Sequence, residues 1–198
     1  MANINDYLIW RGDIPINSKF PLNEVDSMIL ARFSYLRFDK IKLEKEETIK
    51  SISNKMKILE DEEFLYHGDK ELITNLGNSN RFFKMEVTDY EKTTDEKAEK
   101  QFGAVTIHIS EKELYVSYIG TDSTLTGWKE DANMGFMENV PCQIAGKKYL
   151  EKIAKKYPDK KIRIGGHSKG GNVAVYAAIT ASQNVQNRII KVDNYDGP

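Results

Sequence analysis

The first third of the chain places apolar residues at the three- and four-residue spacing of amphipathic helices. Asn23 is a good N-cap residue, and one apolar stripe follows it: Val25, Met28, Ile29, Phe33 and Leu36. A second stripe crosses a stretch of alternating Lys and Glu: Ile49, Ile52, Met56 and Leu59. We interpret these charges as a solvated helix face rather than a partner-binding surface. A short third helix at 71–76 is expected to end at Gly77 in a left-handed C-cap.

From residue 83 the apolar period changes from helical to alternating, which is typical of strands. Residues 83–87 have the pattern of a half-buried strand, and the polar run 91–100 after them predicts a loop. Residues 102–109 and 114–119 are rich in β-branched and aromatic side chains and are joined by four polar residues. An antiparallel hairpin is therefore expected here.

Beyond the hairpin, helical and strand patterns alternate. The expected elements are a helix at 144–157, a strand at 161–164, a helix of small residues at 172–182 and a strand at 189–195. Strand, helix and strand in this order favour parallel neighbours, so the predicted fold class is α/β. We divide the chain into a helical N-terminal part, residues 1–80, that packs on an α/β core, residues 81–198, within one structural domain.

Composition narrows the classes of protein that fit the chain. Lys and Arg number 29 and Asp and Glu number 30, so the net charge is −1 over 198 residues. A near-neutral chain without a basic stripe argues against nucleic acid as a partner. No apolar stretch is long enough to span a bilayer, and the N-terminus does not resemble a signal peptide. The single cysteine, Cys142, cannot form an intrachain disulfide, so we expect a soluble, cytoplasmic protein.

The candidate chemistry lies at residues 166–170, GHSKG, which fit the pattern G-x-S-x-G. The pattern alone is moderate evidence, but a predicted strand precedes it and a predicted helix follows it, as a nucleophile elbow requires. Gly166, Gly170 and Gly171 suit so tight a turn because a Cβ there would collide with the neighbouring strand or helix. Ser168 would then lie at the positive end of a helix dipole. The alternatives are an incidental serine in a glycine-rich turn and a P-loop, whose GK[ST] ending is missing.

These residues resemble known lipases. GHSKGG is similar to the GHSLGG elbow of the class 3 lipases, and Gly120-Thr121-Asp122, with Trp128 and Asp131 after it, resembles their strand-end oxyanion motif and Trp-x-x-Asp. More closely, the chain resembles a bacterial family of lipase-like α/β hydrolases of unknown function, through segments spread over nearly its whole length: 6–13, 101–104, 120–122, 127–131 and 165–178. The resemblance implies an α/β-hydrolase-like three-layer sandwich with a mostly parallel sheet.

The resemblance assigns a role to individual residues. Ser168 would attack an acyl carbonyl, and the oxyanion would be held by the backbone N–H of Lys169 and by the N–H and hydroxyl of Thr121. The alternative for Thr121 is a plain turn residue. His167 is expected to support the elbow by packing and hydrogen bonding, because adjacent residues leave the turn in different directions. The class 3 lipases usually have an apolar residue where Lys169 stands. We expect the Lys169 side chain to point into water, with a cation that favours acidic substrates as the alternative.

Three apolar residues follow the Trp-x-x-Asp segment: Met134, Phe136 and Met137. We interpret them as ordinary core, because apolar clusters are more often buried than functional. The alternative is a lid or an acyl-binding wall, which the related lipases carry in this part of the chain.

The catalytic histidine is missing from its expected place. In α/β hydrolases the triad follows the order Ser, Asp or Glu, His along the chain, whereas no histidine follows Ser168 and the later acids are Asp193 and Asp196. We expect His67 in a turn and His108 on a strand face, neither of them as the base. Asp196 is a weak candidate for the acid, with strand-end turn chemistry as its alternative. Because the chain ends directly after a strand, we expect a C-terminally truncated fragment whose triad acid and histidine lie beyond residue 198.

The sequence therefore predicts a serine hydrolase of the esterase or lipase type, catalytically incomplete over residues 1–198 and without a metal or cofactor. Its expected partner is a small acyl or lipid substrate. One alternative is a non-catalytic α/β-hydrolase scaffold that serves binding. Another is that the charged N-terminal helices are an interaction surface carried on a hydrolase platform.

Overall fold

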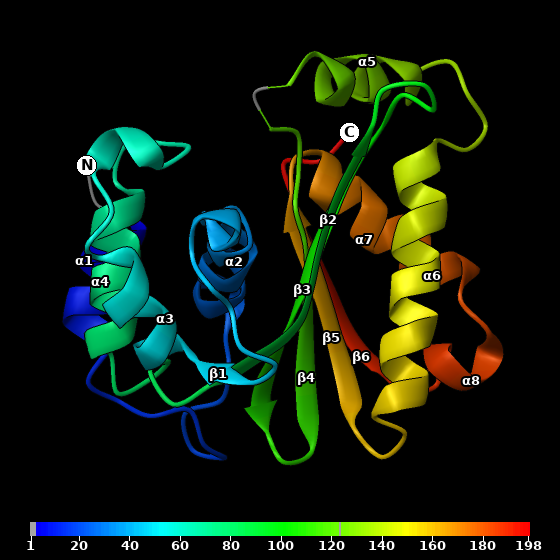
Figure 1. Cartoon of the computed structure of the whole chain (residues 1–198). Helices are drawn as coiled ribbons and strands as arrows, with labels where there is room; N and C mark the ends of the chain where they lie inside the picture. Colours follow the sequence, from blue (N-terminus) through cyan, green and yellow to red (C-terminus); the bar gives the residue numbers. More distant parts are fainter. Residues whose placement is uncertain (1–2, 123) are drawn as a thin grey trace.

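The computed structural model describes residues 3–122 and 124–198 (Figure 1). In chain order its elements, with two short 3-10 helices written η, are α1 (Ile4–Arg11), α2 (Glu24–Phe33), η1 (Phe38–Lys40), β1 (Glu47–Thr48), α3 (Ile49–Met56), η2 (Asp61–Glu63), α4 (Asp69–Asn78), β2 (Glu86–Asp95), β3 (Lys100–Ser110), β4 (Glu113–Tyr118), α5 (Leu125–Asn133), α6 (Pro141–Lys156), β5 (Lys161–His167), α7 (Lys169–Thr180), α8 (Gln183–Gln186) and β6 (Ile189–Tyr195). Among these residues no helix is both long enough and apolar enough to cross a membrane.

A six-stranded sheet forms the centre of the described structure, in the order β1-β2-β3-β4-β5-β6. The first three pairings, up to β3 with β4, are antiparallel, and β4 with β5 and β5 with β6 are parallel. The predicted α/β class and the predicted parallel pair β5 and β6 are confirmed. The prediction of a mostly parallel sheet is wrong: the sheet is mixed, because short turns join β2 to β3 and β3 to β4, and short connections allow only antiparallel neighbours.

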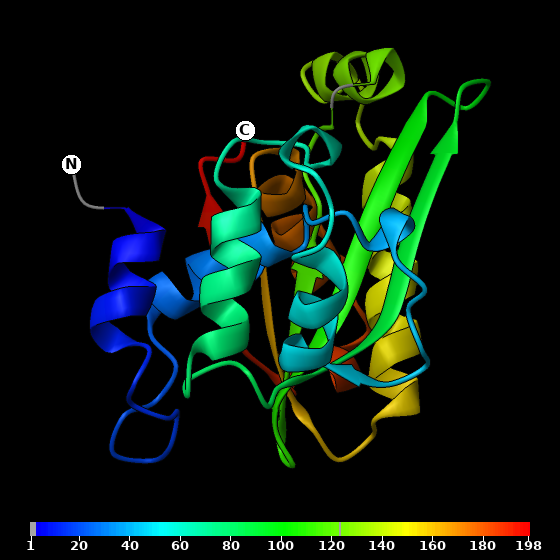
Figure 2. The ribbon, with the colours of Figure 1, turned by 60° about the vertical axis from the view of Figure 1, so that its left-hand side comes forward.

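Helices lie on both sides of the sheet (Figures 1 and 2). The N-terminal helices α1 to α4 lie on one side, and α6, α7 and α8 lie on the other. Along β3 the side chains alternate between these two layers: Val105 and Ile107 pack with the N-terminal helices, whereas Ala104 packs with α6 and α7. β4 alternates in the same way, with Tyr115 on the first side and Val116 on the second. Two apolar cores therefore hold the sheet.

The N-terminal helices form largely where their patterns predict them. Asn23 caps α2 in a reciprocal capping box with Asp26. Of the predicted second stripe, Ile49, Ile52 and Met56 are fully buried on α3, whereas Leu59 lies beyond the helix and is partly buried. The predicted end of the third helix at Gly77 is wrong, because α4 continues to Asn78 and Gly77 has no left-handed conformation. A Cβ at Gly77 would lie 2.2 Å from the side-chain oxygen of Ser53. The glycine therefore permits the close approach of α3 and α4 rather than ending a helix.

The polar run 91–100 is not a loop, contrary to the prediction. β2 continues to Asp95, a turn occupies residues 96–99, and β3 begins at Lys100. The two strands pair in register from Asp95 with Lys100 to Glu91 with Ala104. Most side chains of residues 91–99 are exposed, so this end of the hairpin has little apolar surface and no alternating pattern to reveal it.

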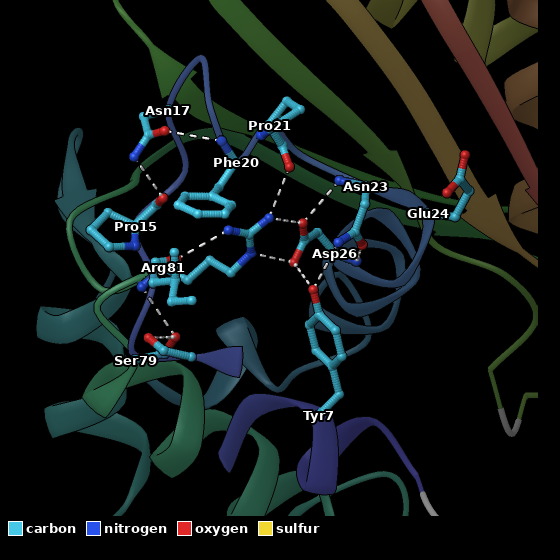
Figure 3. Close-up of polar contacts among 12 residues, drawn as sticks. Tyr7, Pro15, Asn17, Phe20, Pro21, Asn23, Glu24, Asp26, Ser79 and Arg81 are labelled. Atoms are coloured by element: carbon cyan, nitrogen blue, oxygen red, sulfur yellow. Dashed lines mark hydrogen bonds and ion pairs between the residues drawn. The ribbon is translucent and has the colours of Figure 1, made fainter. Parts of the chain in front are cut away.

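A buried ion pair between Arg81 and Asp26 joins the N-terminal segments (Figure 3). Both side chains are fully buried. The Arg81 guanidinium donates to both carboxylate oxygens of Asp26, with the Nε bond at 2.7 Å. Its other N–H groups donate to the carbonyl oxygens of Ile14 at 3.0 Å and Pro21 at 2.9 Å.

The carboxylate of Asp26 is satisfied by two further donors. It accepts the hydroxyl of Tyr7 at 3.0 Å and the backbone N–H of Asn23 at 2.9 Å. The side-chain amide of Asn23 in turn donates to the Tyr7 hydroxyl at 2.9 Å. The network thus connects α1, the segment before α2, α2 itself and the segment between α4 and β2.

We expect Arg81→Met to lower the free energy of unfolding by about 3–5 kcal/mol, because it leaves the Asp26 carboxylate buried without a counter-ion. Urea unfolding followed by circular dichroism measures the change. The matched control is Lys42→Met, which removes one partner of the exposed pair with Glu44 and should change stability by no more than about 0.5 kcal/mol. Equal effects of the two substitutions would contradict the role of the network.

Candidate active site

Ser168 lies in the turn between β5 and α7 with φ and ψ of 54° and −134°. This conformation costs a non-glycine residue free energy, and it persists only where the surrounding structure holds it. Its N–H donates to the carbonyl of Tyr195 at the end of β6, at 2.8 Å. Its own carbonyl accepts the N–H of Gly171 at 2.8 Å. Strand, strained serine and helix therefore follow each other directly, and Ser168 is the N-terminal cap residue of α7.

Close backbone contacts explain the glycines around Ser168. A Cβ at Gly166 would lie 2.3 Å from the carbonyl of Gly170. One at Gly170 would lie 2.3 Å from the carbonyl oxygen of Tyr118, and one at Gly171 would lie 2.1 Å from the side chain of Asn194. Larger residues at these three positions would push α7 away from the ends of β4, β5 and β6.

A pocket of about 430 Å³ opens beside Ser168. Thr121, which follows the end of β4, lines the same pocket. The hydroxyl oxygen of Thr121 is buried and has no hydrogen-bond partner among the described residues. A buried hydroxyl without a partner costs about 1–3 kcal/mol, which distinguishes Thr121 among the residues that line this pocket.

Tyr35, which sequence reasoning did not single out, connects the two strand ends that carry Thr121 and Ser168. Its hydroxyl donates to the carbonyl of His167 at 3.0 Å, and a Cβ on Gly120 would lie 2.0 Å from the same hydroxyl. Burial, and then the neighbouring Tyr66, raises the pKa of Tyr35, while a hydrogen bond from the Gly120 backbone opposes the shift. Tyr35 therefore stays a neutral donor at this junction.

The ring of His167 is exposed and packs edge-on against Tyr35, with ring centroids 6.0 Å apart. Its Nδ1 lies 3.3 Å from the Tyr35 hydroxyl. His167 also lines the pocket at Ser168. These contacts agree with a packing residue beside the elbow, and the supporting role stays a prediction.

The side chain of Lys169 is fully buried, so the expectation that it points into water is wrong, and so is the alternative of a cation at the mouth of the site. Its ammonium donates to the Glu130 carboxylate at 2.9 Å, to the Gln101 side-chain oxygen at 2.7 Å and to the Gln101 carbonyl at 3.0 Å. Glu130 also accepts the backbone N–H groups of Gln101 and Cys142. The ammonium neutralises this buried carboxylate, which an apolar residue at position 169 would leave unpaired.

Sequence reasoning missed Gln101 and Glu130, although both lie in segments that resemble lipases. A signal was present, because Lys169 directly follows Ser168 and departs from the apolar residue of the lipase pattern that the elbow resembles. A lysine there needs a buried acid if its side chain cannot reach water. Glu130 on α5 and Gln101 on β3 are far from Lys169 in the sequence, so no local spacing connects them to Lys169.

We expect Glu130→Gln and Lys169→Met each to lower the free energy of unfolding by about 3–5 kcal/mol. Each substitution leaves the other member of the ion pair buried without its counter-ion. The double variant should lose clearly less than the sum of the two, which a double-mutant cycle of urea unfolding measures. Lys129→Met is the control, because Lys129 is exposed on the same helix and pairs only loosely with Glu99. Simple additivity of the two losses would show that the ion pair does not couple the residues.

The upstream histidines lie where the sequence predicts them. His67 is exposed in the turn before α4. His108 lies on β3, where its Nε2 is 3.1 Å from the Thr88 hydroxyl and its Nδ1 is 2.9 Å from the Lys160 ammonium. It pairs with Leu114 at the start of β4, whereas the elbow follows the end of the parallel strand β5. His108 therefore lies at the opposite end of the strands from Ser168. The position of His108 therefore argues against a role as the base.

Burial, and then the Lys160 ammonium, lowers the pKa of His108. The unfolded chain therefore binds this proton more tightly, and stability should fall as the pH drops through the unfolded value of about 6.5. We expect His108→Gln to lose less stability than the native chain between about pH 7.5 and about pH 5.5. Urea unfolding across that range tests this, with exposed His67→Gln as the control. The same pH dependence in all three proteins would refute the assignment.

The two acids after Ser168 have different surroundings. Asp193 is buried and accepts the Ser27 hydroxyl of α2 at 2.7 Å. Asp196 is exposed after β6, and a Cβ on the next residue, Gly197, would lie 2.7 Å from the Ser168 carbonyl. Asp196 is therefore close to the backbone of the elbow, and its role as the acid stays a prediction. Within residues 3–122 and 124–198, no group of three or more acidic, His or Cys side chains is placed to hold a metal ion.

The predicted apolar cluster after α5 is mostly exposed. Phe136 is 91% and Met137 49% exposed, whereas Met134 packs partly buried against the core of α6 and α7. Leu125 and Trp128 on α5 are exposed as well. The interpretation as ordinary core is thus wrong for Phe136, which is almost fully exposed, and for Met137, which is about half exposed. The alternative of a lid or acyl-binding wall stays a prediction.

Comparisons with known proteins find one family model and distant structural similarities. A family model described as Mbeg1-like matches residues 76–198. A fungal lipase in complex with an inhibitor, from work on interfacial activation in lipases, is similar in structure at 17% identity; the match covers 77% of this chain and 51% of that chain, with a TM-score of 0.43. The nonglycosylated LIP2 lipase of Yarrowia lipolytica is similar at 16% identity over 56% of this chain and 45% of its own, with a TM-score of 0.37. The chain thus spans about half the length of these lipases. No curated protein sequence matches it.

Proposed function

The chain belongs to the Mbeg1-like family, and on that premise we propose that it is a serine hydrolase of the esterase or lipase type with Ser168 as its nucleophile. The observation that carries the proposal is the backbone of Ser168. It is a non-glycine residue at positive φ, between a parallel strand and a helix, at the wall of a pocket. A nucleophile elbow has this geometry, because the sharp turn exposes the serine hydroxyl to substrate.

The proposed chemistry is acyl transfer. The Ser168 oxygen forms a bond to the acyl carbon as its proton passes to a general base, and the carbonyl oxygen becomes an oxyanion. The oxyanion then re-forms the carbonyl as the ester C–O bond breaks and the alcohol leaves with that proton, and water hydrolyses the acyl-enzyme. The N–H of Lys169 is a candidate donor, since the first N–H groups of a helix have no partner within it. The N–H and the unpartnered hydroxyl of Thr121 are the other candidate donors, and one such donor is typically worth about 2.7–4 kcal/mol in the transition state.

Hydrolysis also needs a general base beside the serine and an acid that orients the base. Among the residues that the structure describes, none forms a hydrogen bond with the Ser168 hydroxyl. The proposal therefore assigns the nucleophile and the oxyanion donors, and it leaves Asp196 as a weak candidate for the acid. The expected substrate is an acyl ester or lipid, and no cofactor is required.

A fluorophosphonate probe followed by intact mass tests the proposal. We expect one adduct on the protein in its full-length form, because the probe bonds to an activated serine. The adduct should be lost in Ser168→Ala and kept in Ser182→Ala, which removes the exposed serine that precedes α8. An adduct that survives Ser168→Ala would overturn the assignment of the nucleophile.

A second candidate function is a non-catalytic binding protein built on the same scaffold. The specific observation that favours it is the missing hydrogen bond to the Ser168 hydroxyl among the described residues. In that case the folded full-length protein would give no adduct, although the pocket at Ser168 would still bind a small ester.

A further inference from the structure

A second pocket, of about 350 Å³, lies between the N-terminal helices and the elbow. Its lining residues come from α1, α2, the segment after α2, the segment before α4 and the end of β5: Ile4, Met28, Arg32, Tyr35, Tyr66 and His167. Three of them also line the pocket at Ser168: Tyr35, Tyr66 and His167. The two pockets are therefore neighbours that share a wall of aromatic rings.

Contacts between aromatic rings hold the shared wall in place. Tyr35 contacts Tyr66 edge-on at 5.9 Å between centroids and His167 at 6.0 Å. Tyr35 is almost fully buried and is fixed by its hydrogen bond to the His167 carbonyl. Rings held in this way form a firm apolar surface that leads from Ser168 to the second pocket.

Among the described residues that line the second pocket, the permanently charged side chain is Arg32, and this side chain is paired. The Arg32 guanidinium pairs with the buried Asp69 carboxylate and lies over the Tyr66 ring at 4.3 Å and the Tyr35 ring at 5.2 Å. The charge of Arg32 is thus already compensated by Asp69, so the pocket does not favour the binding of an anion. Met28, 42% exposed, and the partly buried Ile4 present hydrocarbon to the pocket. A pocket of this kind favours an uncharged apolar group.

We propose that this pocket, defined by Ile4, Met28, Tyr35, Tyr66 and His167 with the paired Arg32, binds the hydrocarbon chain of the ester that Ser168 attacks. The proposal rests on the proposed function. From a carbonyl beside Ser168, the chain crosses the rings of His167 and Tyr35 and ends against Ile4 and Met28.

The proposal also gives the N-terminal helices a role. All lining residues except His167 precede residue 76, where the match to the family model begins. Residues outside the matched segment would then set the preferred chain length, while residues inside it carry the nucleophile. Each methylene that the pocket removes from water should strengthen binding by about fourfold, from about 0.8 kcal/mol per methylene.

Binding is tested first without catalysis, in the Ser168→Ala protein with 13C-labelled methionine methyl groups. Titration with methyl octanoate, which carries the hydrocarbon on the acyl side, should shift the Met28 methyl resonance and leave that of Met56, buried in the core of the N-terminal helices, unchanged. Octyl acetate, which carries it on the alcohol side, distinguishes the two parts of the ester. No Met28 shift with either ester up to its solubility limit would overturn the proposal.

Variants of α2 then test the location. Met28→Glu, in the same Ser168→Ala background, places a charge in the pocket and should weaken methyl octanoate binding, measured by calorimetry, by about tenfold or more. Val25→Glu is the matched control, since Val25 is partly exposed on the same helix but does not line the pocket; its affinity should stay within about twofold of the parent. Equal losses in both variants would refute the location.

The fluorophosphonate experiment separates this inference from the proposed function. An adduct at Ser168 without a Met28 shift would support the proposed hydrolase and refute the hydrocarbon-binding pocket. A Met28 shift without an adduct would leave a chain-binding pocket on a non-catalytic protein and would remove the hydrolase.

Discussion

The buried ion pair between Arg81 and Asp26 is the constraint on which the N-terminal layer depends. Taking two charges out of water is costly unless nearly every donor and acceptor finds a partner. Here the partners come from Tyr7 on α1, from the carbonyls before α2 and from the cap of α2. The charges can be satisfied together only when these segments meet in one arrangement, so the pair selects that arrangement more than it adds stability to it.

Helix α2 and the residues just after it connect this arrangement to the candidate site. Ser27 on this helix donates to the buried Asp193 of β6 and contacts the Tyr115 hydroxyl of β4 at 2.8 Å. Tyr35, just beyond the end of α2, then bonds to the carbonyl of His167. On the other side of the sheet the buried pair of Lys169 with Glu130 attaches the start of α7 to α5. Two buried ion pairs thus fix the surroundings of the elbow from opposite directions.

The sequence predicted the parts of the fold that short-range patterns determine. The β3–β4 hairpin, the parallel β5 and β6 and the turn at Ser168 each follow from local periodicity and glycine placement. Two of the errors have the same cause, which is a partner distant in the chain: Gly77 makes room for Ser53, and Lys169 pairs with Glu130. Residues 91–95 have near partners on β3, but their mostly exposed side chains give no alternating apolar pattern that would predict the pairing. For the site, the sequence indicated Ser168 and Thr121, but it could not indicate Tyr35, whose importance arises only from the packing of α2 against two strand ends.

The strained backbone of Ser168 bears on the choice between a nucleophile and an incidental serine. A positive φ at a non-glycine residue costs about 1–3 kcal/mol, and glycine would relieve most of that cost. Gly166, Gly170 and Gly171 are glycines because no Cβ fits there, whereas position 168 bears a side chain although its conformation favours glycine. The surrounding structure maintains this conformation through the bond from the Ser168 N–H to the end of β6 and through the first turn of α7. A side chain at positive φ, at a pocket wall and beside an unpartnered Thr121 hydroxyl, is what the proposed nucleophile requires, whereas glycine would serve a turn alone.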